Sequence, residues 1–420
     1  MDSILGEVKK YNCWDGKSFD AGYERKDYLE QIAKFINNKL VKVIIGQRRV
    51  GKSYVMRQII NYLIEKMRID PKHTFYLNKE YLVFDNIRTS KELEQLFRKY
   101  LEHFNISGKV YIFLDEVQHI ENWESFVNSY SQEYTGDYEL FITGSNSELL
   151  SGEFASLLSG RFIEFRIYSF SLFEYSGYKN LEINKNTFLE YLKSGGMPEM
   201  FSLREEEMQR HYIESLKNTV ILRDIVQRNK VRDIALLEDI FKYITINIGN
   251  LSSIPGIIKY FKNIRRKTNF ETLSFYIGCL RDTFIIHEAE RFNLKGKQIL
   301  SGERKYYLGD LAFKNFLFGF SPADIGNNLE NYIYMQLLRM GFEVFVGILD
   351  NYEVDFVAIK RNKTIYIQVS YLLSETRTIE REFGNLLKIK DNHEKIVITL
   401  DDMKFDNYEG ILHMHPWELR

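Results

Sequence analysis

The amino-acid sequence predicts an α/β protein with a parallel β-sheet core in its first third, a largely helical middle and a second α/β domain at its end. Three observations lead to this prediction. Apolar runs at 42–45, 110–114 and 140–143 each end in glycine, acidic or small polar residues, as buried parallel strands do. Helix-spaced apolar residues dominate from about 186 to 283, and a helix with three short strands is expected over 327–369.

Length and composition limit the possible organisation. A chain of 420 residues with 45% apolar residues is expected to form two or three domains. The 57 basic and 58 acidic residues nearly cancel, so a nucleic-acid partner must be inferred from a local patch. No run of about 18 apolar residues occurs, and the first residues are charged, so we expect neither membrane insertion nor secretion. Cys13 and Cys279 indicate ordinary thiols of a reducing cytoplasm.

The first strand leads into a glycine-rich loop. The motif G-x-x-x-x-G-K-S stands between this strand and the helical pattern of Tyr54–Lys66, the context of a P-loop, or Walker A motif. Such a loop surrounds phosphates with backbone N–H groups and a helix N-terminus. We expect Lys52 to contact the β- and γ-phosphates of ATP and the Ser53 hydroxyl to bind Mg²⁺. The predicted nucleotide-binding residues here are Gly46, Gln47, Arg48, Arg49, Val50, Gly51, Lys52, Ser53 and Tyr54.

Two acidic residues directly follow the second strand. A carboxylate in this position completes the Mg²⁺ shell of P-loop enzymes, so we expect Asp115 to bind Mg²⁺. Glu116 is then placed to orient or deprotonate the attacking water and is predicted to be catalytic, together with Lys52. Two solvated acids at a strand end are the alternative, which the P-loop disfavours.

Small polar residues and an arginine follow the next two strands. Ser145 and Asn146, after the third strand, are candidates for sensing the γ-phosphate or positioning water, although a strand-to-helix turn also explains them. Arg161 precedes a strand-like run at 162–167. We list it as a third catalytic residue that stabilises transition-state charge in its own subunit or across an interface, with a structural role as the alternative.

The middle of the chain predicts three helices followed by two strands. Helices are expected at 234–248, 255–262 and 270–283, and strands within 284–308, which is the winged-helix order. Just before the third helix, nine residues without an acid contain Lys259, Lys262, Arg265, Arg266 and Lys267. We call these five residues the basic patch and expect DNA phosphate contacts there. Winged helices also act as protein-interaction or oligomerisation modules, so either DNA or a protein is a possible partner of this domain.

Several segments together resemble the extended AAA-type ATP-binding proteins of bacteria and archaea. They are the P-loop with its double arginine, 114–118, 142–146, 159–161, 195–199, 222–225, 353–356 and 367–370. The resemblance implies a P-loop ATPase core over 1–170, a helical lid region over 171–230, a winged-helix-like domain over 231–320 and a nuclease-like domain over 321–420. It also implies ATP rather than GTP as the nucleotide.

The last domain resembles the restriction-endonuclease-like core. In that core a helix Glu, a strand Asp and a Glu/Gln-x-Lys motif surround a divalent metal ion. Glu330, Asp355 and Gln368 occupy these positions, but Ser370 stands where the lysine belongs. Serine carries no positive charge, so we expect a degenerate, binding domain unless a lysine such as Lys388 acts instead.

Three functions are therefore compatible with the sequence. The first is an ATP-hydrolysing switch or machine, possible as an oligomer, with ATP and Mg²⁺ as its ligands. The second is a DNA-binding regulator that senses ATP with little hydrolysis, which the basic patch favours. The third is a metal-dependent nuclease, which Ser370 disfavours.

Overall fold

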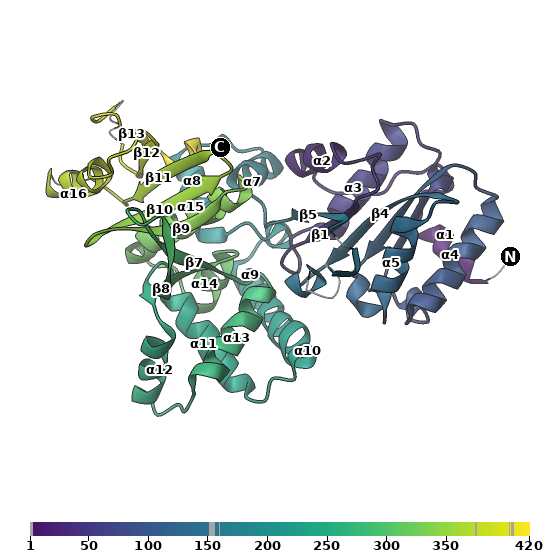
Figure 1. Cartoon of the computed structure of the whole chain (residues 1–420), viewed down its shortest axis with the longest axis horizontal. Helices are drawn as coiled ribbons and strands as arrows, with labels where there is room; N and C mark the ends of the chain where they lie inside the picture. The colour runs from purple at the N-terminus through teal and green to yellow at the C-terminus, as the bar shows by residue number, and fades with distance from the viewer. Residues whose placement is uncertain (1–2, 151–155, 159, 374–375, 403, 405–406) are drawn as a thin grey trace. The chain divides into compact units, whose positions relative to one another are not determined.

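The structure is a computed structural model that describes residues 3–150, 156–158, 160–373, 376–402, 404 and 407–420. Ser159, part of one motif used above, lies outside these residues. The chain divides into two units, Met1–Ile167 and Tyr168–Arg420. The sequence predicts this boundary near 170. Figure 1 shows a sheet with helices on both faces in the first unit, and a larger sheet and a helical region in the second.

The first unit is built on a five-stranded parallel sheet in the order β2-β3-β4-β1-β5. Its strands are β1 Val41–Ile45, β2 Thr74–Asn78, β3 Lys109–Asp115, β4 Asp137–Gly144 and β5 Phe162–Arg166. The apolar runs expected to form parallel strands are β1, β3 and β4, and their residues are largely buried. β2, which lies at one edge of the sheet, is not among the strands predicted from the sequence.

Helices cover both faces of this sheet. They are α1 Ser3–Lys10, α2 Lys26–Ala33, α3 Lys52–Glu65, α4 Ser90–Phe104 and α5 Trp123–Gln132. The connection from β1 to β2 crosses the sheet in one direction, and β2, β3 and β4 then return in the other. Right-handed crossovers therefore place α3 on one face and α4 and α5 on the opposite face, as Figure 1 shows.

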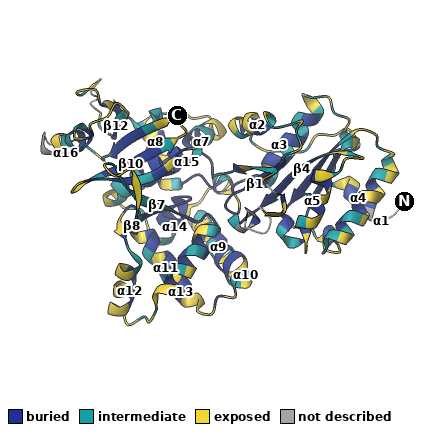
Figure 2. Ribbon diagram, viewed as in Figure 1, coloured by how far each residue is buried: buried dark blue, intermediate teal, exposed yellow. Residues whose placement is uncertain are grey.

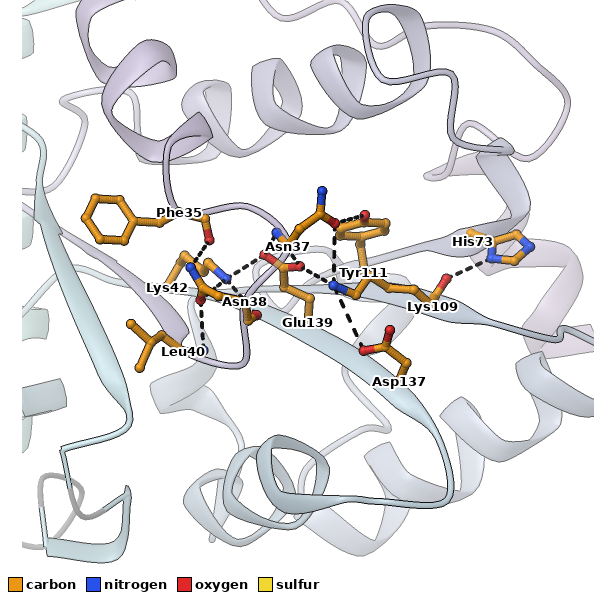
Figure 3. A network of polar contacts seen from close by, with 10 residues as sticks. All are labelled: Phe35, Asn37, Asn38, Leu40, Lys42, His73, Lys109, Tyr111, Asp137 and Glu139. Carbon is orange, nitrogen blue, oxygen red and sulfur yellow. Dashed lines mark hydrogen bonds and ion pairs between the residues drawn. The ribbon is translucent and has the colours of Figure 1, made fainter.

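A buried ionic network ties the amino edge of this sheet together (Figure 3). Nζ of Lys42, in β1, lies 2.5 Å from Oε1 of Glu139, in β4, and both side chains are fully buried. Glu139 also accepts hydrogen bonds from the backbone N–H of Asn37, at 3.1 and 3.0 Å, and from Lys109 in β3, at 3.1 Å. The network therefore joins three neighbouring strands to the loop that precedes β1.

The second unit contains most of the helices. Its helices are α7 Leu172–Lys179, α8 Lys185–Ser194, α9 Glu206–Thr219, α10 Gln227–Asn229, α11 Ile234–Ile246, α12 Ile254–Asn263, α13 Phe270–Asp282, α14 Ala312–Phe318, α15 Ile325–Arg339 and α16 Thr376–Leu387. A π-helical segment, Val220–Val226, continues α9. Among the described residues, no helix combines the length and the apolar character needed to cross a membrane.

One eight-stranded sheet organises this unit, in the order β13-β12-β11-β10-β9-β7-β8-β6. Its strands are β6 Leu251–Ser252, β7 Ile286–Asn293, β8 Gln298–Leu308, β9 Glu343–Leu349, β10 Tyr352–Lys360, β11 Lys363–Val369, β12 Glu394–Ile398 and β13 Leu412–Met414. The hairpin β7–β8 pairs with β9 through β7. The sheet therefore runs across the domain boundary predicted at 320, and that boundary stays a prediction.

The helical middle follows the expected order of elements. α11, α12 and α13 precede the hairpin, and the short β6 between α11 and α12 pairs antiparallel with β8. Ser253 caps α12 by accepting a hydrogen bond from the N–H of Gly256 (3.2 Å), and Pro255 stands in the first turn. Figure 2 shows that the outward faces of α12 and α13 are exposed, whereas the middle parts of β10 and β11 in the sheet are buried.

Candidate functional site

The P-loop connects β1 to α3 at the carboxyl edge of the first sheet. Gly46 has a φ angle of 151° and Gly51 one of 97°, conformations that favour glycine. A Cβ atom on Gly46 would lie 2.1 Å from the carbonyl oxygen of Ile167, so a larger residue does not fit there. Gly51 stands directly before α3, which begins at Lys52. The loop therefore has the tight turn and the helix N-terminus that phosphate binding uses.

Lys52 folds back over this loop. Its Nζ donates hydrogen bonds to the carbonyl oxygens of Gly46 (3.0 Å) and Gln47 (3.1 Å). It also lies 3.8 Å from Oε1 of Glu116, and both side chains are buried. The structure therefore brings two predicted catalytic residues, Lys52 and Glu116, together.

Asp115 lies at the centre of a buried hydrogen-bond cluster. Its carboxylate accepts hydrogen bonds from Tyr76 (2.9 Å), Asn78 (2.8 Å) and Thr143 (2.5 Å), and a further one from the Ser53 side chain. Burial and the neighbouring Glu116 raise the pKa of Asp115 above its usual range, although these hydrogen bonds oppose the shift. A cation beside Asp115 and Ser53 would stabilise the carboxylate, so this pair fits Mg²⁺.

Glu116 is held in a fixed orientation next to Asp115. It has a φ angle of 57°, and its backbone N–H donates a hydrogen bond to the Thr143 hydroxyl (2.9 Å). Its carboxylate accepts a hydrogen bond from the Gln118 side chain. Burial raises the pKa of Glu116, but Lys52, the Gln118 hydrogen bond, Arg48 and His119 together bring it below its usual value. The lowered pKa favours the ionised form of Glu116, which is the form that a general base requires.

Ser145 and Asn146 lie at the same edge of the sheet. Ile45 pairs with Gly144, so the residues that follow β4 stand beside Gly46. Both side chains are buried. Among the described residues, the Ser145 hydroxyl oxygen and the Gln47 amide nitrogen are buried and have no hydrogen-bond partner. Such groups are costly, and phosphate oxygens would accept hydrogen bonds from both. The residues at this edge therefore fit ATP bound with Mg²⁺.

The remaining predicted loop residues differ in their surroundings. Arg48 is buried, and its Nη1 lies 2.9 Å from Oε1 of Glu80. Arg49 is exposed with a φ angle of 67°. Tyr54 is 46% exposed in the first turn of α3. Val50 is buried, and its carbonyl oxygen accepts a hydrogen bond from the Arg25 side chain.

Residues that the sequence analysis missed support the loop. Nη1 of Arg25, whose side chain is buried, donates a hydrogen bond to the Val50 carbonyl oxygen (3.0 Å). The backbone N–H of Arg25 donates one to Gln58 of α3 (3.0 Å). The Asp115 carboxylate is likewise fixed by side-chain hydrogen bonds from Tyr76, Asn78 and Thr143. The one available signal for Thr143 was that it is the polar last residue of the predicted strand 140–143.

Arg161 lies at the opposite edge of the sheet. Its carbonyl oxygen accepts a hydrogen bond from the N–H of Val41, the first residue of β1, at 3.0 Å. Its Nε donates one to the carbonyl of Leu158 at 3.2 Å. β1 rises about 3.3 Å per residue, which puts Val41 roughly 13 Å from Ile45 and the P-loop. The predicted role of Arg161 at the nucleotide site of its own chain is therefore corrected, and a role across a subunit interface stays a prediction.

The basic patch lies on α12 and the loop before α13. Lys259, Lys262, Arg265 and Lys267 are exposed. Arg266 is instead engaged in ion pairs with Asp233 (3.3 Å) and Asp239 (3.0 Å). Four of the five predicted cations are therefore available to a partner.

The nuclease-like positions surround a lysine that the sequence analysis did not consider. Nζ of Lys305, in β8, lies 3.0 Å from Glu330, 2.8 Å from Glu353 and 3.8 Å from Asp355. Gln368 accepts a weak hydrogen bond from the N–H of Asp355 at 3.4 Å.

Lys388, the lysine suggested from the sequence, instead lies over the ring of Tyr352, with Nζ 3.2 Å from the ring centroid. Within the residues that the structure describes, no three His, Cys, Asp or Glu side chains are grouped so as to hold a metal ion. The ammonium group of Lys305 lies among the carboxylates of Glu330 and Asp355, where the nuclease-like core would hold its metal ion. We therefore do not propose nuclease activity.

Comparisons with protein families give two matches. Residues 38–176 match an AAA domain. Residues 185–324 match a domain of unknown function, DUF8612. Among solved structures, the Walker-type ATPase paby2304 of Pyrococcus abyssi gives a TM-score of 0.46 at 16% identity, covering 71% of this chain and 97% of that chain.

Two curated relatives extend over nearly the whole chain. An uncharacterized protein of Haemophilus influenzae is 32% identical over 403 residues, which cover 94% of this chain and 98% of that protein. The uncharacterized protein MJ1544 of Methanocaldococcus jannaschii is 33% identical over 410 residues, covering 91% and 88%. The chain belongs to the family of these two proteins, and its first unit carries an AAA-type P-loop nucleotide-binding domain.

Proposed function

We propose that the AAA domain binds ATP with Mg²⁺, hydrolyses it and acts as a nucleotide-driven switch. The observation that carries this proposal is the meeting of Lys52, Ser53, Asp115 and Glu116 at one edge of the sheet. Lys52 exchanges its hydrogen bonds with the loop carbonyls for the β- and γ-phosphates. Ser53 and Asp115 hold Mg²⁺, which supplies positive charge to the phosphate oxygens.

The other residues at this edge complete the reaction. Glu116 accepts a proton from the attacking water, and Thr143 keeps it in position through the backbone. Ser145 and Asn146 contact the γ-phosphate or the water. Arg161 contributes transition-state charge only in an oligomer, to the site of a neighbouring subunit, because it lies far from its own site.

Replacing Lys52 with alanine tests the binding step. We expect ATP affinity to fall at least about 30-fold, because removing a buried charge partner costs about 2–5 kcal/mol. Lys66→Ala, at the exposed end of the same helix, is the matched control and should leave affinity unchanged. Isothermal titration with ATP and Mg²⁺ gives both values, and equal affinities for the two variants would contradict the proposed site.

A second candidate function is DNA binding regulated by ATP. The observation that favours it is the exposure of Lys259, Lys262, Arg265 and Lys267, which lie close together along the chain. Exposed cations of this kind contact the phosphates of duplex DNA and release counterions. The winged-helix order of α11, α12, α13 and the following hairpin supports the same candidate.

The double variant Lys259→Ala/Lys262→Ala tests this candidate. We expect weaker binding of a labelled DNA duplex and a slope of log affinity against log salt reduced by about 1.8, since each phosphate contact contributes about 0.9. Fluorescence anisotropy at several salt concentrations measures both. Lys363→Ala/Lys390→Ala removes two exposed lysines outside the patch and is the control. An identical slope for both double variants would rule out the patch as the DNA contact.

A further inference from the structure

An open cavity of about 600 Å³ lies in the second unit between two loops. One loop precedes α11 and contributes Lys230, Arg232 and Asp233; the other precedes α13 and contributes Lys267. The first turns of α13 complete the wall with Phe275 and Tyr276. This volume lies in the range of pockets that hold a small organic molecule or one nucleotide. The cavity thus joins one end of the basic patch to cations that the sequence analysis did not include.

The cavity carries an excess of positive charge. Lys230, Arg232 and Lys267 are all exposed. Asp233 is the one acid among the described lining residues, and its carboxylate is already engaged. It accepts a hydrogen bond from the N–H of Leu236 (2.9 Å) as the cap of α11 and pairs with Arg266 (3.3 Å). The cavity therefore attracts an anion.

An aromatic side chain stands beside these cations. Phe275 is 49% exposed, which leaves part of its ring available to a partner. The neighbouring Tyr276 is buried, with its ring centroid 5.9 Å from that of Phe275, and its hydroxyl accepts a hydrogen bond from the N–H of Asp233 (3.1 Å). Tyr276 thereby links α13 to the loop before α11. Cations next to a half-exposed ring match a ligand that is both anionic and aromatic.

We propose that this cavity binds a single-stranded segment of DNA. Lys230, Arg232 and Lys267 contact its phosphates, and one base stacks on Phe275. Bases of a duplex are stacked on each other, so a ring in a cavity of this size reaches a base only where the strands are separated. The inference rests on the proposed DNA-binding function of this unit and adds a single-strand site next to the basic patch.

Phe275→Ala is the central variant of the test. We expect it to weaken binding of a labelled oligothymidylate of roughly 15 nucleotides about 5- to 150-fold, the usual effect of losing one stacked base. Phe275→Trp should retain the affinity, because its ring also stacks. Binding of a DNA duplex should be unchanged in both variants. Tyr134→Ala, which removes a 90% exposed ring elsewhere in the chain, is the control.

The double variant Lys230→Ala/Arg232→Ala tests the phosphate contacts. For the oligothymidylate, the slope of log affinity against log salt should fall by about 1.4, since a single strand contributes about 0.7 for each contact. Thermal unfolding midpoints equal to that of the wild type show that the variants remain folded.

The outcomes separate this inference from the function on which it rests. Normal duplex binding with no binding of the oligothymidylate overturns the single-strand site alone. Absence of binding to either DNA overturns both proposals. Equal losses of duplex and single-strand affinity in Phe275→Ala would also overturn the site, because stacking on an unpaired base would not explain them.

Discussion

Replacing Glu116 with glutamine is expected to leave ATP binding nearly intact and to slow ATP hydrolysis about 100- to 10,000-fold, the range attributed to a positioned general base. Glutamine has the size of glutamate and accepts the Gln118 hydrogen bond, but it does not take up a proton from water. The carboxylate of Glu116 is buried, within 3.8 Å of Lys52, and fixed through Thr143. Steady-state phosphate release measures the rate, and isothermal titration measures ATP binding.

Glu121→Gln is the matched control for this variant. It makes the same chemical change five residues further on, at an exposed position. Its hydrolysis rate should equal that of the wild type. A Glu116→Gln protein that hydrolyses ATP at the normal rate would show that Glu116 is not the base. A variant that loses ATP binding as completely as Lys52→Ala would show instead that Glu116 has a binding or structural role.

The nucleotide site could be predicted from the sequence only where its residues are neighbours in the chain. The P-loop places Gly46 and Lys52 within one motif, so strand, loop and helix predict its geometry directly. Asp115 and Glu116 were found because they end an apolar strand. Their supports come from other strands: Tyr76 and Asn78 from β2 and Thr143 from β4. Those contacts depend on strand order, which the sequence does not state.

Strand register explains the misplacement of Arg161. A sequence motif does not show at which edge of the sheet a residue that flanks a strand lies. In a parallel sheet, however, they lie at opposite edges. The pairing of Val41 with Phe162 puts Arg161 at the amino edge, whereas Ser145 and Asn146 follow β4 at the carboxyl edge.

The second unit shows a similar limit. The helices α11, α12 and α13 and the strands β9, β10 and β11 were expected from their apolar spacing. The hairpin β7–β8 was expected within the winged-helix-like domain because it follows α13 directly. One edge of β7 pairs with β8, and its other edge pairs with β9 and so extends the sheet of the next segment. Lys305 thereby reaches Glu330 and Asp355, although a motif search near Ser370 does not find it.

Lys42→Met is expected to destabilise the first unit by about 3–5 kcal/mol, the usual cost of removing one partner of a buried ion pair. The variant leaves the Glu139 carboxylate buried with Lys109 as its remaining cation within the network of Figure 3. Burial already lowers the pKa of Lys42, while Glu139 opposes this shift, so each charge depends on the other. Urea unfolding followed by tryptophan fluorescence measures the loss, since Trp14 and Trp123 both belong to this unit.

Two further variants separate the ion pair from other effects of the substitution. Lys10→Met removes an exposed cation 2.7 Å from Glu7 and should cost no more than about 1 kcal/mol. Lys42→Met/Glu139→Gln removes both charges of the pair. It should cost clearly less than the sum of its single variants, because each single variant leaves one buried charge without its partner and the double variant leaves neither. Additive costs in this cycle would mean that the pair contributes no coupling. The network would then stabilise the strand that carries the P-loop through packing and the Asn37 hydrogen bonds alone.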